Sequence, residues 1–284
     1  MVDSPPLVTV VTPVLDGAAY IAATIESVLA QDYANLEYLV IDGGSEDGTA
    51  QIVRGYGERV RFVRERDRGQ ADAINRGFRL GSGSILAFLN ADDVYARDAV
   101  TRGVAELARR PEAGVVYGRA DLIDENGREI GRYPVEPFEA ASLAQRCFIA
   151  QPATFIRRDA YDQVGGFDPT LHFAFDYDFW IRLSRLRPFV MIDAVLASAR
   201  VHAGSKTVSQ PRPACSEAVS VLSRHFGYVP YGWVFALSNA IVGGEGRQAG
   251  KVGLSLILGL VRNWRSPSRY VADWLSYRGF AKRR

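Results

Sequence analysis

Short apolar runs alternate with helix-like segments along the first hundred residues. Four runs rich in Val, Ile, Leu and Phe are typical of buried strands, and they cover residues 7–14, 36–45, 59–65 and 84–93. The segments between them carry apolar residues at helical spacing and cover residues 18–31, 47–57 and 69–81. Strands that alternate with helices at this spacing predict an α/β fold with a mostly parallel sheet and helices on both faces.

Polar side chains follow each of the four predicted strands. They are Thr12 and Asp16, then Asp42 and Ser45, then Asp67, and finally Asn90, Asp92 and Asp93. Ligands of parallel sheets bind beyond the carboxyl ends of the strands. The sequence therefore predicts a polar binding site at this edge of the sheet.

The second half of the chain is less regular. Two strands are expected around the turn at 124–127, a strand and a short helix over 153–167, and a helix over 175–187. Residues 214–284 read as helical, with apolar stretches at 233–244 and 251–264. From Val261 to Arg284 there are seven Lys or Arg residues against one Asp.

Composition narrows the class of protein. Hydrophobic residues make up 48% and charged residues 23% of the 284 positions, which is ordinary for a globular protein. A net charge of +2 argues against a nucleic-acid binder. Two cysteines, Cys147 and Cys215, argue against a disulfide framework, and the lack of a CxxC pair argues against structural zinc.

No targeting or membrane-spanning segment is expected. The N-terminus lacks the basic and apolar regions of a signal peptide, and no apolar run reaches the ~20 residues of a span. We expect a cytoplasmic protein, either free or peripheral on the inner face of the cell membrane. The C-terminal segment would then contact that membrane surface, form a homodimer interface or cover the core.

Six motifs together resemble the family 2 glycosyltransferases. They occur in the family's order, over residues 8–33, 40–49, 67–78, 88–93, 151–168 and 175–183. The resemblance implies the glycosyltransferase A-type (GT-A, Rossmann-like) fold in a catalytic domain over residues 1–208. Within it, residues 1–98 would bind the nucleotide sugar and residues 99–208 the acceptor, with a helical extension over 209–284.

The resemblance also implies an activity. Members move a sugar from a nucleotide-diphosphate donor, here a UDP-sugar by preference, to a hydroxyl of a glycan or lipid-linked acceptor. The reaction inverts the anomeric carbon and uses Mg²⁺ or Mn²⁺. The residues that match the family's donor-binding positions are Thr12, Pro13, Asp16, Asp42, Asp67, Asp72, Asn90, Ala91, Arg200 and Lys206.

Several donor-side residues have a second interpretation. Asp72 is equally well explained as a first-turn helix carboxylate. Ser45, Asp47 and Thr49 are typical of turns and helix caps. Gly43 follows Asp42 where the family often has a second carboxylate.

The motif Asn-Ala-Asp-Asp at 90–93 resembles the family's acidic metal-binding motif. Hard divalent cations take oxygen ligands and stabilise charge on a departing diphosphate. The resemblance implies Asp92, Asp93 and His202 as ligands, with Asn90 replacing the usual Asp. The alternative is that the two aspartates cap a following helix.

A base must take the proton of the acceptor hydroxyl. Asp176 matches the family's catalytic position at a helix start, where the dipole keeps a carboxylate ionised, and Phe175 stands where Glu is frequent. Arg182 is expected to orient Asp176. The acceptor-side residues implied are Gln151, Pro152 and Trp180, although a core position explains Trp180 as well.

Two other functions compete with glycosyl transfer. A nucleotide-dependent oxidoreductase is disfavoured because the glycine-rich stretch at 43–48 is not GxGxxG. A catalytically inactive scaffold of the same fold stays open because of the departures at Gly43, Asn90 and Phe175.

Overall fold

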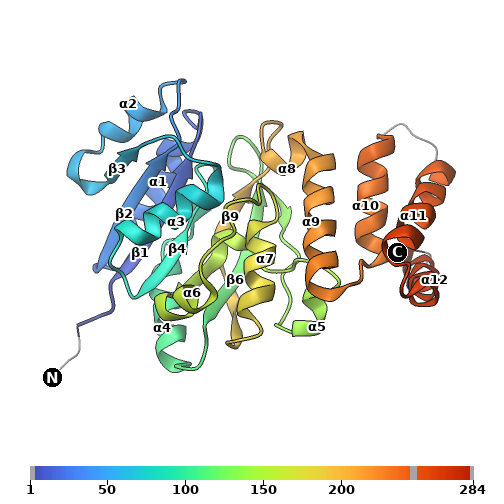
Figure 1. The fold of residues 1–284 in the computed structure, drawn as a ribbon. Coiled ribbons are helices and arrows are strands. Elements are labelled where there is room, and N and C mark those ends of the chain that lie inside the picture. Colours follow the sequence, from blue (N-terminus) through green and yellow to red (C-terminus); the bar gives the residue numbers. More distant parts are fainter. Residues whose placement is uncertain (1–3, 244–247, 282–284) are drawn as a thin grey trace. The chain divides into compact units, whose positions relative to one another are not determined.

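The computed structural model describes residues 4–243 and 248–281. The chain separates into two compact units (Figure 1). Unit 1 comprises Met1–Phe138 and Phe148–His202, and unit 2 comprises Glu139–Cys147 and Ala203–Arg284. The functional boundary expected at residue 208 is not tested by this division and stays a prediction. Lys282, Arg283 and Arg284, counted in the basic end, lie outside the described residues.

Unit 1 opens with four parallel strands, as the apolar runs predict. They are β1 (Val8–Val14), β2 (Leu36–Asp42), β3 (Arg61–Arg64) and β4 (Ile85–Phe88), in the order β3-β2-β1-β4. Every residue of β1 and β4 is buried. Burial on both faces explains why these strands are continuous apolar runs rather than alternating ones.

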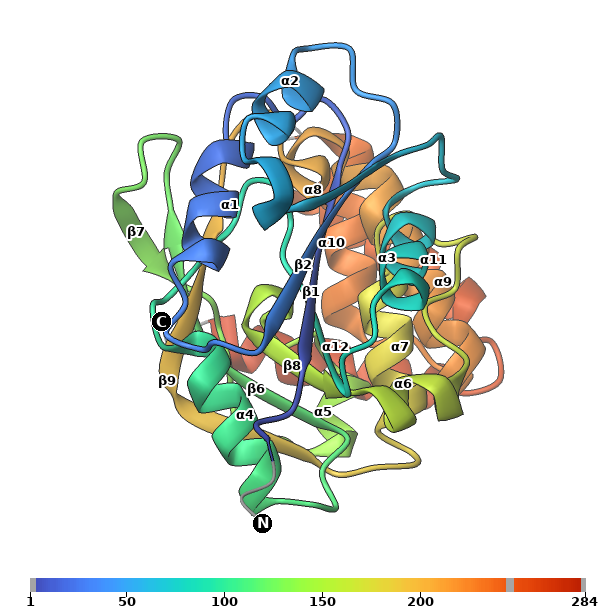
Figure 2. The ribbon, with the colours of Figure 1, turned by 90° about the vertical axis from the view of Figure 1, so that its left-hand side faces the viewer.

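Helices cover both faces of this sheet (Figure 2). α1 (Ile21–Leu29), α2 (Thr49–Arg54) and α4 (Ala99–Arg109) contribute to the apolar core on one face. α3 (Gln70–Leu80) packs on the other face, where Gly77 lets it approach β1. A Cβ at position 77 would lie 2.5 Å from Val11 Cγ1, so the close contact requires glycine.

The rest of the sheet mixes directions. β8 (Thr154–Arg157) pairs antiparallel with β4 and β6 (Val115–Ile123), and β6 pairs in parallel with β9 (Phe189–Arg200). β5 (Val94–Tyr95) and β7 (Glu129–Arg132) add short antiparallel pairs. The twelve-residue β9 is a strand that the sequence patterns did not predict. The remaining elements of unit 1 are η1 (Gly57–Arg59), η2 (Gln151–Ala153), α6 (Arg158–Val164) and α7 (Phe175–Leu183).

An aromatic cluster fills the space between α3, α6 and α7. Phe167 lies at its centre, with ring centroids 4.5 Å from Phe179, 5.4 Å from Phe175 and 5.3 Å from Phe88. Phe175 is only 4% exposed. Phe175 therefore serves the core, which explains an apolar residue at a position where Glu is frequent in the resembling family.

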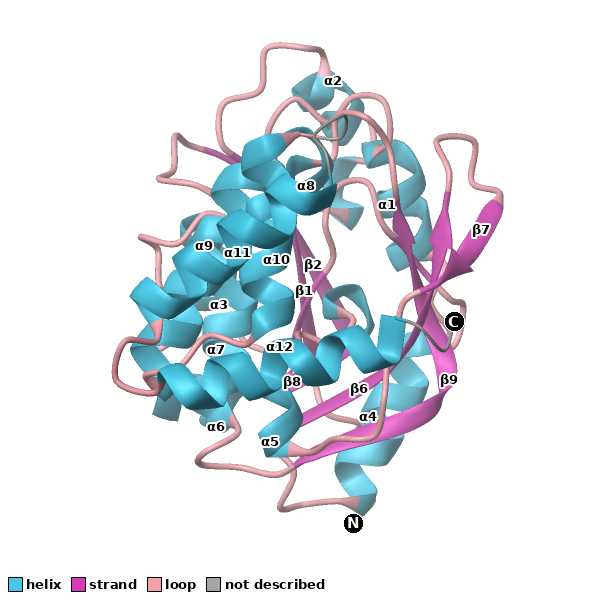
Figure 3. Cartoon of the chain, turned by 90° about the vertical axis from the view of Figure 1, so that its right-hand side faces the viewer, coloured by secondary structure: helices cyan, strands magenta, loops and turns pink. Residues whose placement is uncertain are grey.

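Unit 2 is built of helices and loops (Figure 3). It contains α5 (Ala140–Leu143), α8 (Lys206–Ser209), α9 (Pro211–Phe226), α10 (Tyr231–Val242), α11 (Gln248–Arg262) and α12 (Pro267–Ala281). Helical structure was predicted for this segment, and over the described residues it is confirmed. None of the described helices is both long and apolar enough to cross a bilayer.

Candidate active site

Asp42 ends β2 with a fully buried carboxylate. Its Oδ1 accepts hydrogen bonds from Gly44 N, Ser45 N and Ser45 Oγ, at 3.1, 2.8 and 2.6 Å. Its Oδ2 lies 3.2 Å from Arg64 Nε but accepts no hydrogen bond from the described residues. The ion pair with Arg64 offsets the charge of this buried oxygen, which still has capacity to accept an N–H.

The loops that follow β1 and β2 are joined to each other. Asp16 adopts φ 52°, a conformation uncommon outside glycine. Four hydrogen bonds connect the loops: Asp16 N to Ser45 Oγ, Glu46 N to Asp16 Oδ1, Gly17 N to Thr49 Oγ1, and Ala18 N to Asp47 Oδ2, all between 2.8 and 2.9 Å. Ser45, Asp47 and Thr49 are thus turn residues, as predicted, and they also fix the neighbouring loop. Gly48 holds the N-cap position of α2, but Asp47 Oδ1 accepts the N–H of Thr49, the first residue of the helix, at 3.0 Å.

Asp67 stands beside Gly43. A Cβ at position 43 would lie 2.8 Å from Asp67 Oδ2, so a side chain there would push this carboxylate away. Asp67 Oδ1 accepts the Gly69 N–H at 2.8 Å. Burial, opposed by that hydrogen bond, raises the pKa of the Asp67 carboxyl. Asp67 therefore supplies a second carboxylate close to the position where Gly43 replaces one.

The carboxylate of Asp72 accepts hydrogen bonds from Arg68, just before α3. The Arg68 backbone N–H and guanidinium both donate to its carboxylate at 3.2 Å, and these contacts lower the pKa of Asp72. The interpretation as a first-turn helix carboxylate fits these contacts. Its role in donor binding stays a prediction.

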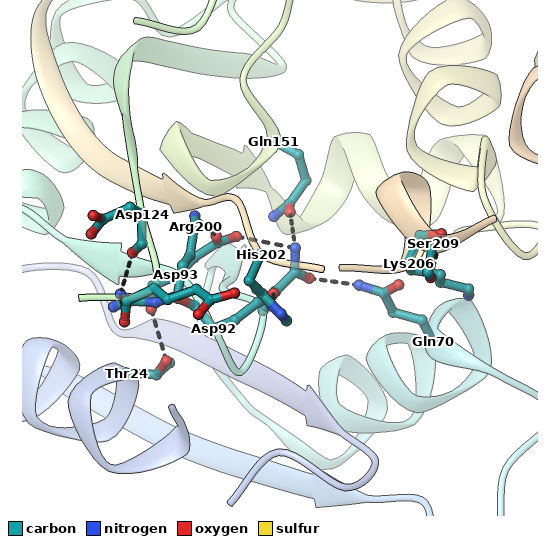
Figure 4. A network of polar contacts seen from close by, with 12 residues as sticks. Thr24, Gln70, Asp92, Asp93, Asp124, Gln151, Arg200, His202, Lys206 and Ser209 are labelled. Atoms are coloured by element: carbon teal, nitrogen blue, oxygen red, sulfur yellow. Dashed lines mark hydrogen bonds and ion pairs between the residues drawn. The ribbon is translucent and has the colours of Figure 1, made fainter. Parts of the chain in front are cut away.

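Asn90 hydrogen-bonds to the side-chain amides of Gln70 and Gln151, which are labelled in the polar network of Figure 4. Its Oδ1 accepts from Gln70 Nε2 at 2.6 Å, and its Nδ2 donates to Asp93 Oδ2 at 3.1 Å and Gln151 Oε1 at 3.0 Å. Gln151 Nε2 in turn donates to Phe88 O at 2.8 Å. The amide nitrogen of Asn90 thus satisfies two acceptors, which a carboxylate at position 90 could not do.

Asp93 is 4% exposed, and contacts within the protein use both of its oxygens. Oδ1 accepts the Arg200 backbone N–H at 2.9 Å, and Oδ2 accepts from Asn90. Burial, and then the charge of Asp92, raise the pKa of Asp93 well above its ordinary value. These contacts favour a structural role over metal ligation. The capping alternative is wrong, because α4 begins at Ala99 and is flanked by Asp98.

Asp92 and His202 are 110 positions apart in the chain, and their side chains are in contact. Asp92 Oδ2 lies 3.0 Å from His202 Nε2, and the two side chains are 29% and 15% exposed. The Tyr20 ring packs 4.8 Å from the His202 ring, and the Arg200 guanidinium lies 4.8 Å from that Tyr20 ring. The His202 imidazole and the Asp92 carboxylate can therefore contact the same ligand.

Asp92 and His202 are arranged as an open cation site with two protein ligands, not as a closed cage of protein side chains. Over residues 4–243 and 248–281, no cluster of three or more His, Cys, Asp or Glu side chains is arranged to hold a metal. Mg²⁺ usually takes one or two carboxylates and completes its shell with water and substrate phosphate. The partly exposed Asp92 carboxylate meets that requirement, with the His202 nitrogen beside it as a further ligand, whereas the carboxylate of Asp93 is buried and already accepts two hydrogen bonds.

The contacts of Arg200 are directed into the protein. Its Nε donates to Asp92 O at 2.9 Å, and its Nη1 donates to Asp124 O and Glu125 O at 2.9 and 3.2 Å. Arg200 therefore holds the turn at 92–93 against the end of β9, and its predicted contact with the donor stays a prediction. Lys206 belongs to unit 2, where it begins α8, and its role also stays a prediction.

Other donor-side residues lie at the end of β1 and after β4. Thr12 is fully buried, and its hydroxyl lies 2.9 Å from Tyr38 Oη. Pro13 is buried within β1, and Ala91 is half-buried in the turn after β4. Their donor-binding roles are untested.

Asp176 occupies the first turn of α7 and is half-buried. Its Oδ1 accepts the Tyr177 N–H at 2.7 Å, at the positive end of the helix dipole. Arg182 does not orient it, which corrects that expectation. The guanidinium of Arg182 instead pairs with the buried Asp178 at 2.7 Å and donates to Val164 O and Gly166 O.

The predicted acceptor residues divide into two groups. Gln151 and Pro152 lie in η2, and Gln151 joins the Asn90 network. Trp180 has no exposed surface and packs edge-on against Phe179 and Phe189. Its placement on the acceptor side is therefore wrong, because a side chain sealed in the core offers no surface for a sugar to stack on.

Sequence comparison identifies relatives along most of the chain. A family model described as Glycosyl transferase family 2 matches residues 9–174. An uncharacterized glycosyltransferase of Rickettsia felis is 29% identical over an alignment of 229 residues that covers 74% of this chain and 37% of that protein. A PGL/p-HBAD biosynthesis glycosyltransferase of Mycobacterium tuberculosis is 31% identical over 182 residues, 62% of this chain and 69% of that one. The chain thus spans little more than a third of the Rickettsia felis relative.

Solved structures share the fold. S. aureus TarS 1-349 in complex with UDP-GlcNAc has a TM-score of 0.62 at 17% identity, covering 91% of this chain and 73% of that one. The mannosyltransferase PcManGT from Pyrobaculum calidifontis, in complex with GDP-Man and Mn²⁺, has a TM-score of 0.64 at 20% identity, covering 95% and 86%. These likenesses show the GT-A fold.

Proposed function

The chain belongs to glycosyl transferase family 2, and we propose that it transfers a sugar from a nucleotide-diphosphate donor to an acceptor hydroxyl. We propose an inverting reaction assisted by Mg²⁺ or Mn²⁺. A UDP-sugar is the favoured donor, and a glycan or lipid-linked molecule is the acceptor. No contact in the described residues calls for an oxidoreductase.

One observation carries this proposal: the polar strand ends form a continuous series of contacts. The series begins at the buried Asp42 and passes to Asp67, which stands beside the neighbouring Gly43; Asp67 accepts the Gly69 N–H, and Gln70 follows directly in the chain. From Gln70 it continues through Asn90 to Asp93, the neighbour of Asp92, and ends at the Asp92–His202 pair. An acceptor for a base and a candidate cation site thus line the same edge of the sheet, as a nucleotide diphosphate requires.

Each residue has a role in this reaction. Asp42 Oδ2 would accept an imide N–H of the nucleotide base, and Asp92 and His202 would hold the cation. A bound cation would neutralise negative charge on the departing diphosphate. Asp176 would take the acceptor proton while the acceptor oxygen bonds to the anomeric carbon and the diphosphate leaves with the electron pair. A single displacement of this kind inverts the anomeric centre.

A screen of nucleotide sugars with Mg²⁺ or Mn²⁺ tests the proposal, with release of nucleoside diphosphate as the readout. Asp176→Asn should lower turnover about 10²- to 10⁴-fold, the usual contribution of a general base, and keep nucleotide binding. The matched control is Asp162→Asn at an exposed position of α6. Equal turnover in wild type and Asp176→Asn would reject the role of Asp176, and no turnover with any donor would favour an inactive scaffold.

We also propose that the enzyme works on the cytoplasmic side of the cell membrane, peripherally bound or as a homodimer.

TarS is described in complex with UDP-GlcNAc and PcManGT with GDP-Man. Because both nucleotides occur among proteins of this fold, the donor screen should include uridine and guanosine sugars.

A further inference from the structure

The faces of α11 are reversed relative to an ordinary surface helix. Its inward side carries Ser255 and Gly259, and Asn263 continues the four-residue spacing in the turn after the helix; Ser255 and Asn263 are 0% and 2% exposed. A Cβ at position 259 would lie 1.8 Å from Tyr270 Cζ, so glycine admits that ring. Asn263 exchanges hydrogen bonds with Val229 N and O at 2.8 and 3.0 Å. Small and polar side chains therefore make the packed side of this helix.

The outward side of α11, by contrast, is apolar. Ile257, Leu260, Val261 and Trp264 are 63%, 40%, 68% and 68% exposed. Their spacing of i, i+3, i+4 and i+7 places them along one stripe that continues into the turn after the helix. A helix of a water-surrounded protein normally points this stripe into the core. The arrangement therefore indicates an apolar environment outside unit 2.

Cationic side chains border this stripe. Arg262 and Arg265 are exposed, and neither has an ion-pair partner within the described residues. The Arg265 guanidinium lies 5.0 Å from the Trp264 ring. Between residues 248 and 281 the only acid is Asp273, which faces inward. Its Oδ2 accepts from Tyr228 Oη at 3.1 Å and Tyr231 N at 2.6 Å.

We propose that this surface, defined by Ile257, Leu260, Val261, Trp264, Arg262 and Arg265, binds the surface of an anionic lipid bilayer. Apolar side chains with a Trp enter the region below the headgroups, and arginines at their border contact anionic headgroups. A second copy of the chain fits this surface less well. Two copies facing each other through it would bring their arginines together with no Asp or Glu between them to offset the positive charge. The inference stands apart from the transfer reaction, although it would place the enzyme next to a lipid-linked acceptor.

Vesicle binding of the full chain tests this proposal. We compare phosphatidylcholine vesicles with and without phosphatidylglycerol, and expect binding only with the anionic lipid and weaker binding at high salt. Arg262→Gln with Arg265→Gln should weaken binding roughly 25-fold, about fivefold for each charge. The matched control is Arg97→Gln with Arg128→Gln, two exposed arginines of unit 1.

The apolar stripe is tested separately. Brominated lipids should quench Trp264 fluorescence, measured as the difference between wild type and Trp264→Phe. Val261→Ser with Trp264→Ser should abolish vesicle binding, whereas Ile130→Ser with Leu186→Ser, at exposed apolar positions of unit 1, should leave it unchanged. Circular dichroism and thermal melting check that each variant is folded.

Two results would overturn the proposal. The first is equal sedimentation of three proteins with anionic vesicles: wild type, Arg262→Gln with Arg265→Gln, and Val261→Ser with Trp264→Ser. The second is a dimer in analytical ultracentrifugation that Val261→Ser with Trp264→Ser dissociates, which would make the surface a contact between copies. Donor turnover of the same variants without vesicles reports on the transfer reaction alone, so failure of either proposal can be recognised independently.

Discussion

At the scale of single residues, Asn90 shows why an apparent restoration of the acidic motif should fail. Asn90→Asp would replace the N–H donor that now serves Asp93 Oδ2 and Gln151 Oε1 with a third acceptor. We expect the free energy of unfolding to fall by about 1–3 kcal/mol, the cost of leaving buried acceptors unpaired. Urea denaturation would measure the loss.

The loss should shrink at lower pH. There, one of the two neighbouring carboxyls, the new one at position 90 or that of Asp93, keeps its proton and donates to the other. Gln210→Glu makes the same amide-to-acid change at an exposed position and serves as the control. If the Asn90→Asp variant were as stable as wild type at neutral pH, the amide network would be dispensable.

Asp67 leads to a prediction about pH. Because burial raises its pKa, the folded protein keeps a proton on Asp67 at pH values where the unfolded chain has released it. The free energy of unfolding should therefore fall as pH rises from the ordinary aspartate pKa through the raised one. Asp67→Asn lacks this titration, so its stability relative to wild type should increase across that window and then stay constant.

The same substitution should weaken UDP binding about 10- to 100-fold if Asp67 accepts a hydrogen bond from the nucleotide. Urea midpoints over a pH series and calorimetry with UDP are the measurements, with Asp162→Asn as the control. A stability difference that does not vary with pH would contradict the raised pKa.

At the scale of elements, the Asp178–Arg182 pair ties α7 to the turn after α6. Arg182→Met would leave the carboxylate of Asp178, 2% exposed, without its partner and free two backbone carbonyls. We expect the free energy of unfolding to fall by about 3 kcal/mol. This is the low end for a buried ion pair, because Arg182 is 25% exposed. Chemical denaturation measures it.

Arg102→Met is the matched control, since Arg102 pairs with Asp98 at the same helical spacing but both side chains are well exposed. That substitution should cost less than about 1 kcal/mol. The double variant Asp178→Leu with Arg182→Met should recover part of the loss. Equal costs for Arg182→Met and Arg102→Met would show that the buried pair contributes no more than a surface one.

The elements also show where sequence patterns suffice. β1 and β4 were predictable because strands buried on both faces must be apolar throughout. β9 was not, because most of its residues are only half-buried and Asp193 interrupts the run. Yet β9 ends at Arg200, whose backbone N–H binds Asp93, so a strand without a clear pattern completes the site.

At the scale of the whole molecule, the site exists only because distant segments meet. The Asp92–His202 contact joins the turn after β4 to a residue two positions beyond β9. Gln151 in η2 hydrogen-bonds to Asn90 in the same turn. Unit 2 carries a separate function in our proposal, because its exposed stripe and arginines are suited to a lipid surface whether or not unit 1 turns over a donor.

The sequence by itself determined the alternation of strands and helices, the family, and the residue types at the strand ends. It could do so because burial dictates apolar periodicity and because parallel strands deliver their ends to one edge. Only the tertiary structure decided which of those residues are available to a ligand. Asp93 and Arg200 are held by hydrogen bonds within the protein and Trp180 is buried in the core, while Asp92 stays partly exposed beside His202. Hydrogen-bond partners that are far apart in the chain make this distinction, and no local pattern of residues records them.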